Sequence, residues 1–70
     1  MTKATDLVSK EQLENMKVKD ELIITTDLGT RFRIRKTNES EKCFSLYCLT
    51  TKNALCSRCK ADYILGATLF

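Results

Sequence analysis

The sequence predicts a small α+β domain with a short N-terminal helix, a β-hairpin, a second hairpin that bears cysteines, and a short C-terminal helix or turn. Three observations predict it. A helix-start pattern lies near the N-terminus, two β-forming runs flank Asp27-Leu28-Gly29, and four cysteines share one segment with the spacing C-x4-C-x7-C-x2-C. A chain of 70 residues is the size of one domain, predicted over 1–70 with 1–6 as a flexible tail.

The helix-start pattern is centred on Ser9. Ser9 is a favourable N-cap, and Gln12, three residues later, completes a capping box. Val8 and Leu13 stand at the two positions of a hydrophobic staple. We therefore predict an amphipathic helix from Lys10 to Lys17, which serves as a lid on the sheet or, as the less favoured alternative, binds a partner.

The first hairpin is predicted over about residues 21–36. Its arms are an apolar, β-branched run and an alternating run, and the connection between them ends in Gly29, a residue that readily adopts a left-handed conformation. The loop length predicts the partners Glu21–Arg35, Leu22–Ile34, Ile23–Arg33, Ile24–Phe32, Thr25–Arg31 and Thr26–Thr30. In this register the large apolar pairs share one face and the arginines the other, which a one-residue slip would destroy.

The cysteines predict a structural zinc site. Zinc in such sites is held tetrahedrally by four ligands, with sulfur about 2.3 Å from the metal. The C-x2-C pair has the length of a single turn, and the turn residues 51–53 are able to bring the looser C-x4-C pair toward it. The expected ligands of one zinc ion are Cys43, Cys48, Cys56 and Cys59. Open alternatives are two disulfides in any of three pairings, four buried free thiols, or a redox pair at Cys56 and Cys59.

The spacing of the cysteines resembles that of zinc-ribbon or treble-clef modules over roughly residues 43–65. In treble-clef modules the last two ligands lie in the first turn of a helix, so the resemblance implies that position for Cys56 and Cys59. The chain departs from the pattern in two places. Four residues instead of two separate Cys43 from Cys48, and the interval before Cys56 is shorter than usual.

The composition favours a small protein that is stabilised by a metal and has no enzyme activity. The chain has no Trp, three Phe and two Tyr, so a metal that contributes to folding is a plausible addition to a small core. It also has no histidine, which removes the most frequent general acid–base group and every Cys-His or Ser-His arrangement. We therefore expect no enzyme activity and no small-molecule substrate.

Positive charge gathers in the second half of the chain. The net charge is +3, with four basic and six acidic side chains in residues 1–30 and eight basic and three acidic in residues 31–70. The densest basic run consists of Arg31, Arg33, Arg35 and Lys36. It predicts a regulatory module whose hairpin binds nucleic acid, or the transcription machinery on it. The alternative is an ordinary solvated strand face, in which Glu21 neutralises Arg35.

Other charged and aromatic residues have local interpretations. Lys42, Arg58 and Lys60 flank the cysteines and would stabilise a negatively charged metal–thiolate centre. Phe44 and Tyr47 are expected in the core rather than as exposed stacking platforms, because large aromatic side chains are scarce here.

A second functional hypothesis is a protein-binding adaptor or inhibitor, of a kind that a phage or a bacterium could encode. It would use the N-terminal helix and the apolar C-terminal residues Leu65, Leu69 and Phe70. That C-terminal segment would either close the core or present an edge strand to a partner. No apolar run is long enough for a membrane span and no signal peptide is visible, so we expect a cytoplasmic protein that makes no membrane contact.

Overall fold

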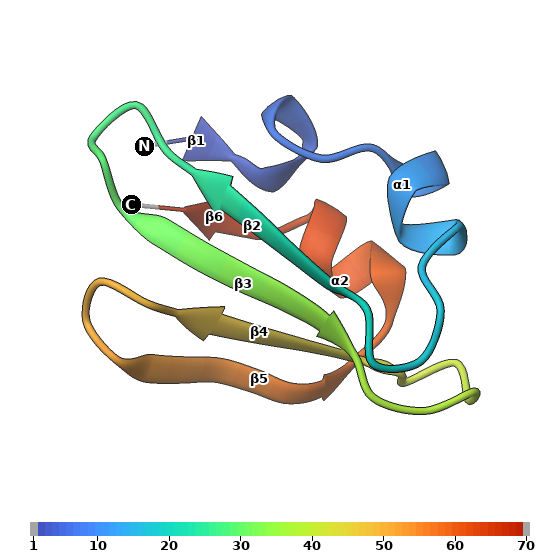
Figure 1. Cartoon of the computed structure of the whole chain (residues 1–70). Helices are drawn as coiled ribbons and strands as arrows, with labels where there is room; N and C mark the ends of the chain where they lie inside the picture. Colours follow the sequence, from blue (N-terminus) through green and yellow to red (C-terminus); the bar gives the residue numbers. More distant parts are fainter. Residues whose placement is uncertain (1, 70) are drawn as a thin grey trace.

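An antiparallel sheet of four consecutive strands organises the computed structural model, which describes residues 2–69 (Figure 1). Within that range the elements are β1 (Thr2–Lys3), the 3-10 helix η1 (Ala4–Asp6), α1 (Lys10–Glu14), β2 (Glu21–Thr25), β3 (Arg31–Lys36), β4 (Phe44–Cys48), β5 (Asn53–Cys59), α2 (Ala61–Leu65) and β6 (Thr68–Leu69). The sheet order is β2-β3-β4-β5, and β1 pairs with β6 separately. The predicted α+β class with two short helices is confirmed.

The β2–β3 hairpin has the predicted register at every ladder position. Leu22 pairs with Ile34 and Ile24 with Phe32, while the arginines pair with the alternate residues of β2. Gly29 has φ +84°, the left-handed conformation that the three-residue connection requires. Local turn chemistry and the alternation of apolar residues therefore specify the same pairing.

Helix α1 begins as predicted and ends early. Both hydrogen bonds of the Ser9–Gln12 capping box are present, and the staple residues Val8 and Leu13 are buried. The helix stops at Glu14 instead of Lys17 because the next residues form a turn. The Lys17 N–H donates to the Asp20 carboxylate at 2.9 Å, a local side-chain bond that competes with helix continuation.

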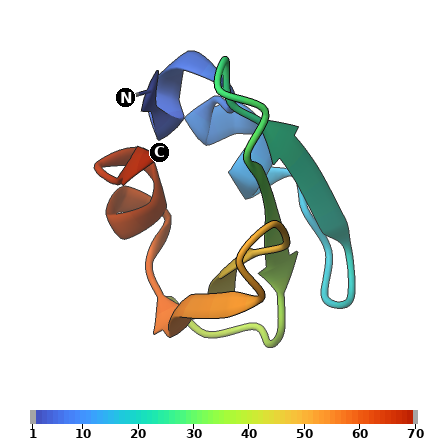
Figure 2. The same ribbon diagram turned by 90° about the vertical axis from the view of Figure 1, so that its left-hand side faces the viewer.

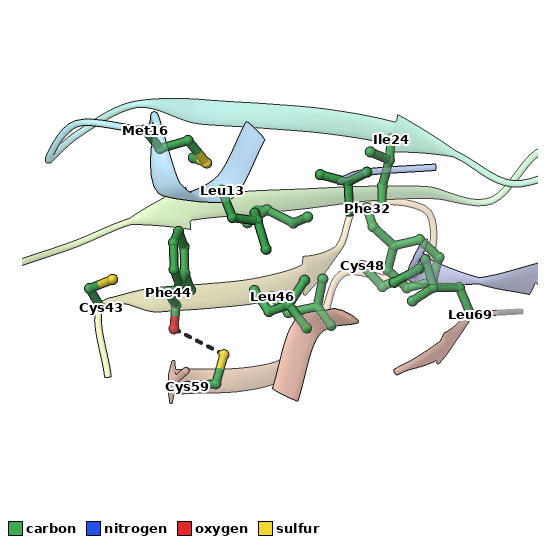
Figure 3. Close-up of a cluster of buried hydrophobic side chains, with 14 residues drawn as sticks. Leu13, Met16, Ile24, Phe32, Cys43, Phe44, Leu46, Cys48, Cys59 and Leu69 are labelled. Atoms are coloured by element: carbon green, nitrogen blue, oxygen red, sulfur yellow. Dashed lines mark hydrogen bonds between the residues drawn. The ribbon is translucent and has the colours of Figure 1, made fainter. Parts of the chain in front are cut away.

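The sheet is curved, and the helices and the β1–β6 pair lie on its concave side (Figure 2). Helix α2 contacts β4 and η1, and α1 contacts α2. Between these layers lies one core, part of which is shown in Figure 3. Its buried members are Ala4, Val8, Leu13, Met16, Ile24, Phe32, Ile34, Cys43, Phe44, Leu46, Cys48, Cys59, Ile64 and Leu69. The opposite, convex face of the sheet is not covered by any element of residues 2–69.

The two chain ends close the core. Residues 2–6, predicted as part of a flexible tail, instead form β1 and η1, and Ala4 is only 1% exposed. Leu69, from the other end, is likewise 1% exposed. The Thr2 hydroxyl donates to the Asp27 carboxylate, which lowers the pKa of Asp27 below its ordinary value. Tertiary pairing with β6 orders a segment that has no local signal of its own.

The cysteine-bearing segment forms the second predicted hairpin, but no ribbon or treble-clef arrangement is confirmed. Cys56 and Cys59 both lie in β5 rather than in the first turn of a helix, since α2 begins at Ala61. Helix α2 ends at Leu65, and Gly66 is its C-cap. The resemblance to treble-clef modules therefore fails at the position of the C-x2-C pair. No helix within residues 2–69 has the length and apolar character needed to cross a membrane.

The capping box gives a test of the local folding signals. We expect Ser9→Ala to destabilise the protein by about 1 kcal/mol, because the Gln12 N–H loses its side-chain acceptor. For a domain of this size the midpoint of thermal unfolding should fall by about 4–8 °C. Ser57→Ala, at an exposed position of β5, is the matched control. Equal midpoints for the two variants would show that the cap contributes nothing.

Candidate functional site

The second hairpin separates the four cysteines instead of gathering them. Cys43 precedes β4 and Cys48 ends it, so the two lie at opposite ends of an extended strand. Five residues of strand span about 16 Å, whereas two ligands of one zinc ion must both lie about 2.3 Å from it. Cys48 pairs with Asn53 beside the turn and is fully buried. It therefore belongs to the core at the far end of the hairpin.

The other three cysteines gather at the open end of the hairpin. Cys59 lies opposite Phe44, the residue after Cys43, across the β4–β5 ladder. The Cys59 thiol donates to the Phe44 carbonyl at 3.1 Å (Figure 3). Burial raises the pKa of Cys59 to about 12, and a hydrogen bond with Cys56 and the charges of the Cys56 and Cys43 thiolates act in the same direction. Cys59 is therefore held as a neutral thiol.

The predicted zinc site has no support in this geometry. Among residues 2–69, no three or more histidine, cysteine or acidic side chains form a group that could hold a metal ion. The four cysteines are free thiols. The sequence prediction required Cys43 and Cys48 to converge on one ion, but β4 holds them at its two ends.

The three cations near the cysteines still surround the thiols. Lys42, Arg58 and Lys60 line a surface pocket of about 320 Å³ together with Cys56, Cys59, Asp62 and Tyr63. Lys60 Nζ also lies 3.8 Å from Glu41 Oε2, an exposed pair of little energetic weight. These cations form a positive rim around the thiols of Cys56 and Cys59.

The basic run on β3 divides between the two faces of the sheet. Arg31, Arg33 and Arg35 project from the uncovered face, alternating with the buried Phe32 and Ile34. Lys36 follows two residues after Ile34, so it lies on the same face of β3 as the buried Phe32 and Ile34. Its ammonium donates to the Met16 carbonyl at 2.9 Å. Lys36, predicted as part of the binding ribbon, is therefore separated from the three arginines and fastens β3 to the turn after α1.

Tyr47 joins the arginines on the uncovered face. Arg33 pairs with Tyr47 across β3 and β4, and the guanidinium carbon lies 5.1 Å from the centre of the tyrosine ring. This distance is that of a cation–π contact. The core prediction holds for Phe44, which is 4% exposed, and is wrong for Tyr47, which packs on the outer face.

The same register adds an apolar neighbour on each side of this contact. Ile23 of β2 lies opposite Arg33 and is 43% exposed, and Ala54 of β5 lies opposite Tyr47. A row of four side chains thus crosses all four strands. We call the three arginines with Ile23, Tyr47 and Ala54 the convex-face patch.

The charges of the convex-face patch are only partly compensated. Arg35 Nε lies 3.8 Å from Glu21 Oε1, as the sequence predicted, and both side chains are close to half exposed. Such a pair contributes little and is screened by salt. The Nε of Arg33 is buried without a hydrogen-bond partner in the structure. The patch therefore presents a net positive surface.

The proposed protein-binding tail is mostly internal. Leu69 is 1% exposed in β6, paired with β1, and Leu65 is half-buried against the core. Phe70 lies outside the described residues. Leu13 of the N-terminal helix is fully buried as well. Of the two roles predicted for this tail, the structure shows core closure.

No protein-family model, curated protein or solved structure matches the chain.

Of the placements of Lys36 and Tyr47, only that of Lys36 could be read from the sequence. Lys36 is two residues beyond Ile34, so strand alternation puts it on the buried face. The position of Tyr47 depends on which residue of β3 it opposes, which the sequence of the β3–β4 connection does not reveal.

Removal of metal tests whether the four cysteines are free thiols or ligands of a zinc ion. We expect protein purified in reducing buffer to keep its far-ultraviolet circular dichroism when a strong chelator is added, because its core is complete without a metal. Native mass spectrometry before and after chelation gives the bound metal directly. One zinc per chain, with loss of folded structure on chelation, would overturn this expectation and restore the four-cysteine site.

Proposed function

We propose that this protein binds nucleic acid, without enzymatic chemistry, through the convex-face patch. The observation that carries the proposal is the combination of three arginines and a tyrosine on one uncovered sheet face. Arginine donates paired hydrogen bonds to a phosphate, and its charge gives affinity that does not depend on sequence. Protein–nucleic acid contacts of this kind position the polymer on the protein surface.

The aromatic contact favours a single strand over a duplex. The Arg33 guanidinium carbon lies 5.1 Å from the centre of the Tyr47 ring, and this pair lies between the small Ala54 and the exposed Ile23. Unpaired bases stack on tyrosine rings and on guanidinium planes, and each stacked base contributes about 1–3 kcal/mol. The bases inside a duplex are already stacked and offer no such face. A sheet with flanking arginines therefore suits an extended single strand.

A partner from the transcription machinery that approaches the nucleic acid is compatible with this surface. The adaptor hypothesis has weaker support, because Leu69 and Leu13 already serve the core. Exposed apolar groups do occur elsewhere, at Leu28 (72% exposed) and Tyr63 (53% exposed), but as single residues. Isolated apolar side chains are common on protein surfaces and do not by themselves indicate a partner.

Substitution of Arg33 tests the electrostatic part of the proposal. We expect Arg33→Ala to weaken binding to a fluorescent single-stranded oligonucleotide by about tenfold, because one charge-assisted contact is lost. The slope of log affinity against log salt concentration should become shallower by about 1. Fluorescence anisotropy over a salt series measures both quantities.

Lys10→Ala is the matched control for this experiment. It removes the same charge from an exposed position of α1, on the opposite side of the sheet, and should change affinity by less than about twofold. Binding that is absent, insensitive to salt, or weakened equally by both substitutions would refute the proposal.

Substitution of Tyr47 tests the stacking part separately. We expect Tyr47→Leu to weaken single-strand binding by about fivefold or more, because an apolar side chain of similar bulk has no flat π-face. The salt slope should not change, since no phosphate contact is removed. Anisotropy with single-stranded DNA, single-stranded RNA and a duplex of the same sequence makes the comparison. A duplex bound as tightly as the single strands would contradict a stacking role.

A further inference from the structure

A bulge in β5 places Cys56 and Cys59 on the same face of the sheet. Strand alternation alone would direct two residues three positions apart to opposite faces. The ladder, however, pairs Cys59 with Phe44 and Cys56 with Leu46, so three residues of β4 (44–46) oppose four of β5 (56–59). Phe44 and Leu46 both point into the core. Their cross-strand partners therefore share that side, and the thiols come into hydrogen-bonding contact.

The two thiols differ in accessibility. Cys59 is 4% exposed and donates its proton to the Phe44 carbonyl at 3.1 Å, whereas Cys56 is half-buried. Strand β5 is at the edge of the four-stranded sheet, so its outer side is not paired with any other strand of residues 2–69. A small molecule that enters the pocket of about 320 Å³ beside this edge meets Cys56 first and finds Cys59 behind it.

The rim of the pocket is chemically selective. Lys42, Arg58 and Lys60 line it, against the single carboxylate of Asp62. A small anionic molecule is therefore attracted to the thiols. Glutathione disulfide, which carries four carboxylates, has the matching charge.

We propose that Cys56 and Cys59 form a thiol–disulfide exchange site that reacts with low-molecular-weight anionic disulfides of the glutathione class. This activity is independent of nucleic-acid binding, because the dithiol and the convex-face patch are on opposite faces of the sheet. Cys56 is the attacking residue and Cys59 the resolving one.

The reaction has two balanced exchange steps. The Cys56 thiolate attacks one sulfur of glutathione disulfide, a Cys56–glutathione mixed disulfide forms, and one glutathione thiolate leaves. Cys59 then gives up its proton to solvent base and attacks the Cys56 sulfur, which breaks the bond to the second glutathione and releases it as a thiolate. The protein dithiol is oxidised to the Cys56–Cys59 disulfide, and one glutathione disulfide is reduced to two glutathione thiols.

The remaining cysteines are not suited to this role. Cys48 lies at the far end of β4 and is 0% exposed. Cys43 is close to Cys59 but is itself 6% exposed, so an entering disulfide reaches Cys56 before it. A disulfide between Cys43 and Cys59 is therefore the competing product that an experiment must separate.

Tryptic mapping separates the two products on the unmodified chain. Trypsin cuts after Lys42, Lys52, Arg58 and Lys60, so Cys56 falls in the peptide 53–58, Cys59 in 59–60, and Cys43 with Cys48 in 43–52. After incubation with glutathione disulfide and alkylation of the remaining thiols, we expect 53–58 joined to 59–60 in non-reducing mass spectra. The peptide 43–52 should be alkylated twice.

Two variants test the order of the steps. Cys59→Ser should accumulate the mixed disulfide on Cys56, seen as the mass of one glutathionyl group on 53–58. Cys56→Ser should stop both products, and Cys48→Ala should react like the unsubstituted protein. Circular dichroism confirms that each variant folds. A linked pair of 43–52 and 59–60, or four thiols still reduced, would overturn the proposal.

Comparison of two oxidants tests the positive rim. We expect glutathione disulfide to react faster than the uncharged hydroxyethyl disulfide at low ionic strength, and the preference to shrink at least about threefold at 0.5 M salt, where charges are screened beyond about 4 Å. A preference that does not change with salt would remove the anionic class from the proposal.

Discussion

The alternation of side chains along β3 is the constraint on which both faces of this protein depend. Phe32 and Ile34 are fully buried, and they anchor the central part of the core. Because successive side chains of a strand point to opposite faces, burying these two residues forces Arg31, Arg33 and Arg35 outward. The same pairing that forms the core therefore also builds the basic surface, and a slip of β3 by one residue would destroy the two together.

The features that were predictable from the sequence are those encoded by neighbouring residues. The capping box at Ser9 and the turn at Gly29 use contacts within a few positions, so their chemistry is visible without the fold. The register of the first hairpin followed because turn length and apolar pattern agree. The length of helix α1 was overestimated, because the Asp20 side chain that competes with its continuation belongs to a turn with a weaker sequence signature.

The features that were not predictable depend on how the strands are placed in the whole sheet. The spacing of the cysteines does not show whether their side chains converge, and only the positions of β4 and β5 show that Cys43 and Cys48 are at opposite ends of one strand. The ordering of residues 2–6 depends on β6, more than sixty residues away. That partner is distant in the chain, which local propensity does not report.

Closure by the termini enlarges the core of a short chain. A chain of this length has little apolar surface to bury, and natural domains of similar size often add a staple. Here Ala4 and Leu69, from opposite ends of the chain, both enter the core at 1% exposure, and the buried cysteines contribute as small apolar side chains. Burial of residues from both ends of the chain thus contributes to the stability of the fold.

The irregular pairing of β4 with β5 connects the two candidate sites. One bulge, between Phe44 and Leu46, aligns Cys56 with Cys59, and the second, between Leu46 and Tyr47, sets Ala54 rather than Leu55 opposite Tyr47. A bulge increases local twist and redirects side chains. A regular ladder would have put Cys56 and Cys59 on opposite faces, and it would have placed the larger Leu55 beside Tyr47. The extra residues in β5 therefore determine both the contact of the thiols on the inner face and the space beside the tyrosine ring on the outer one.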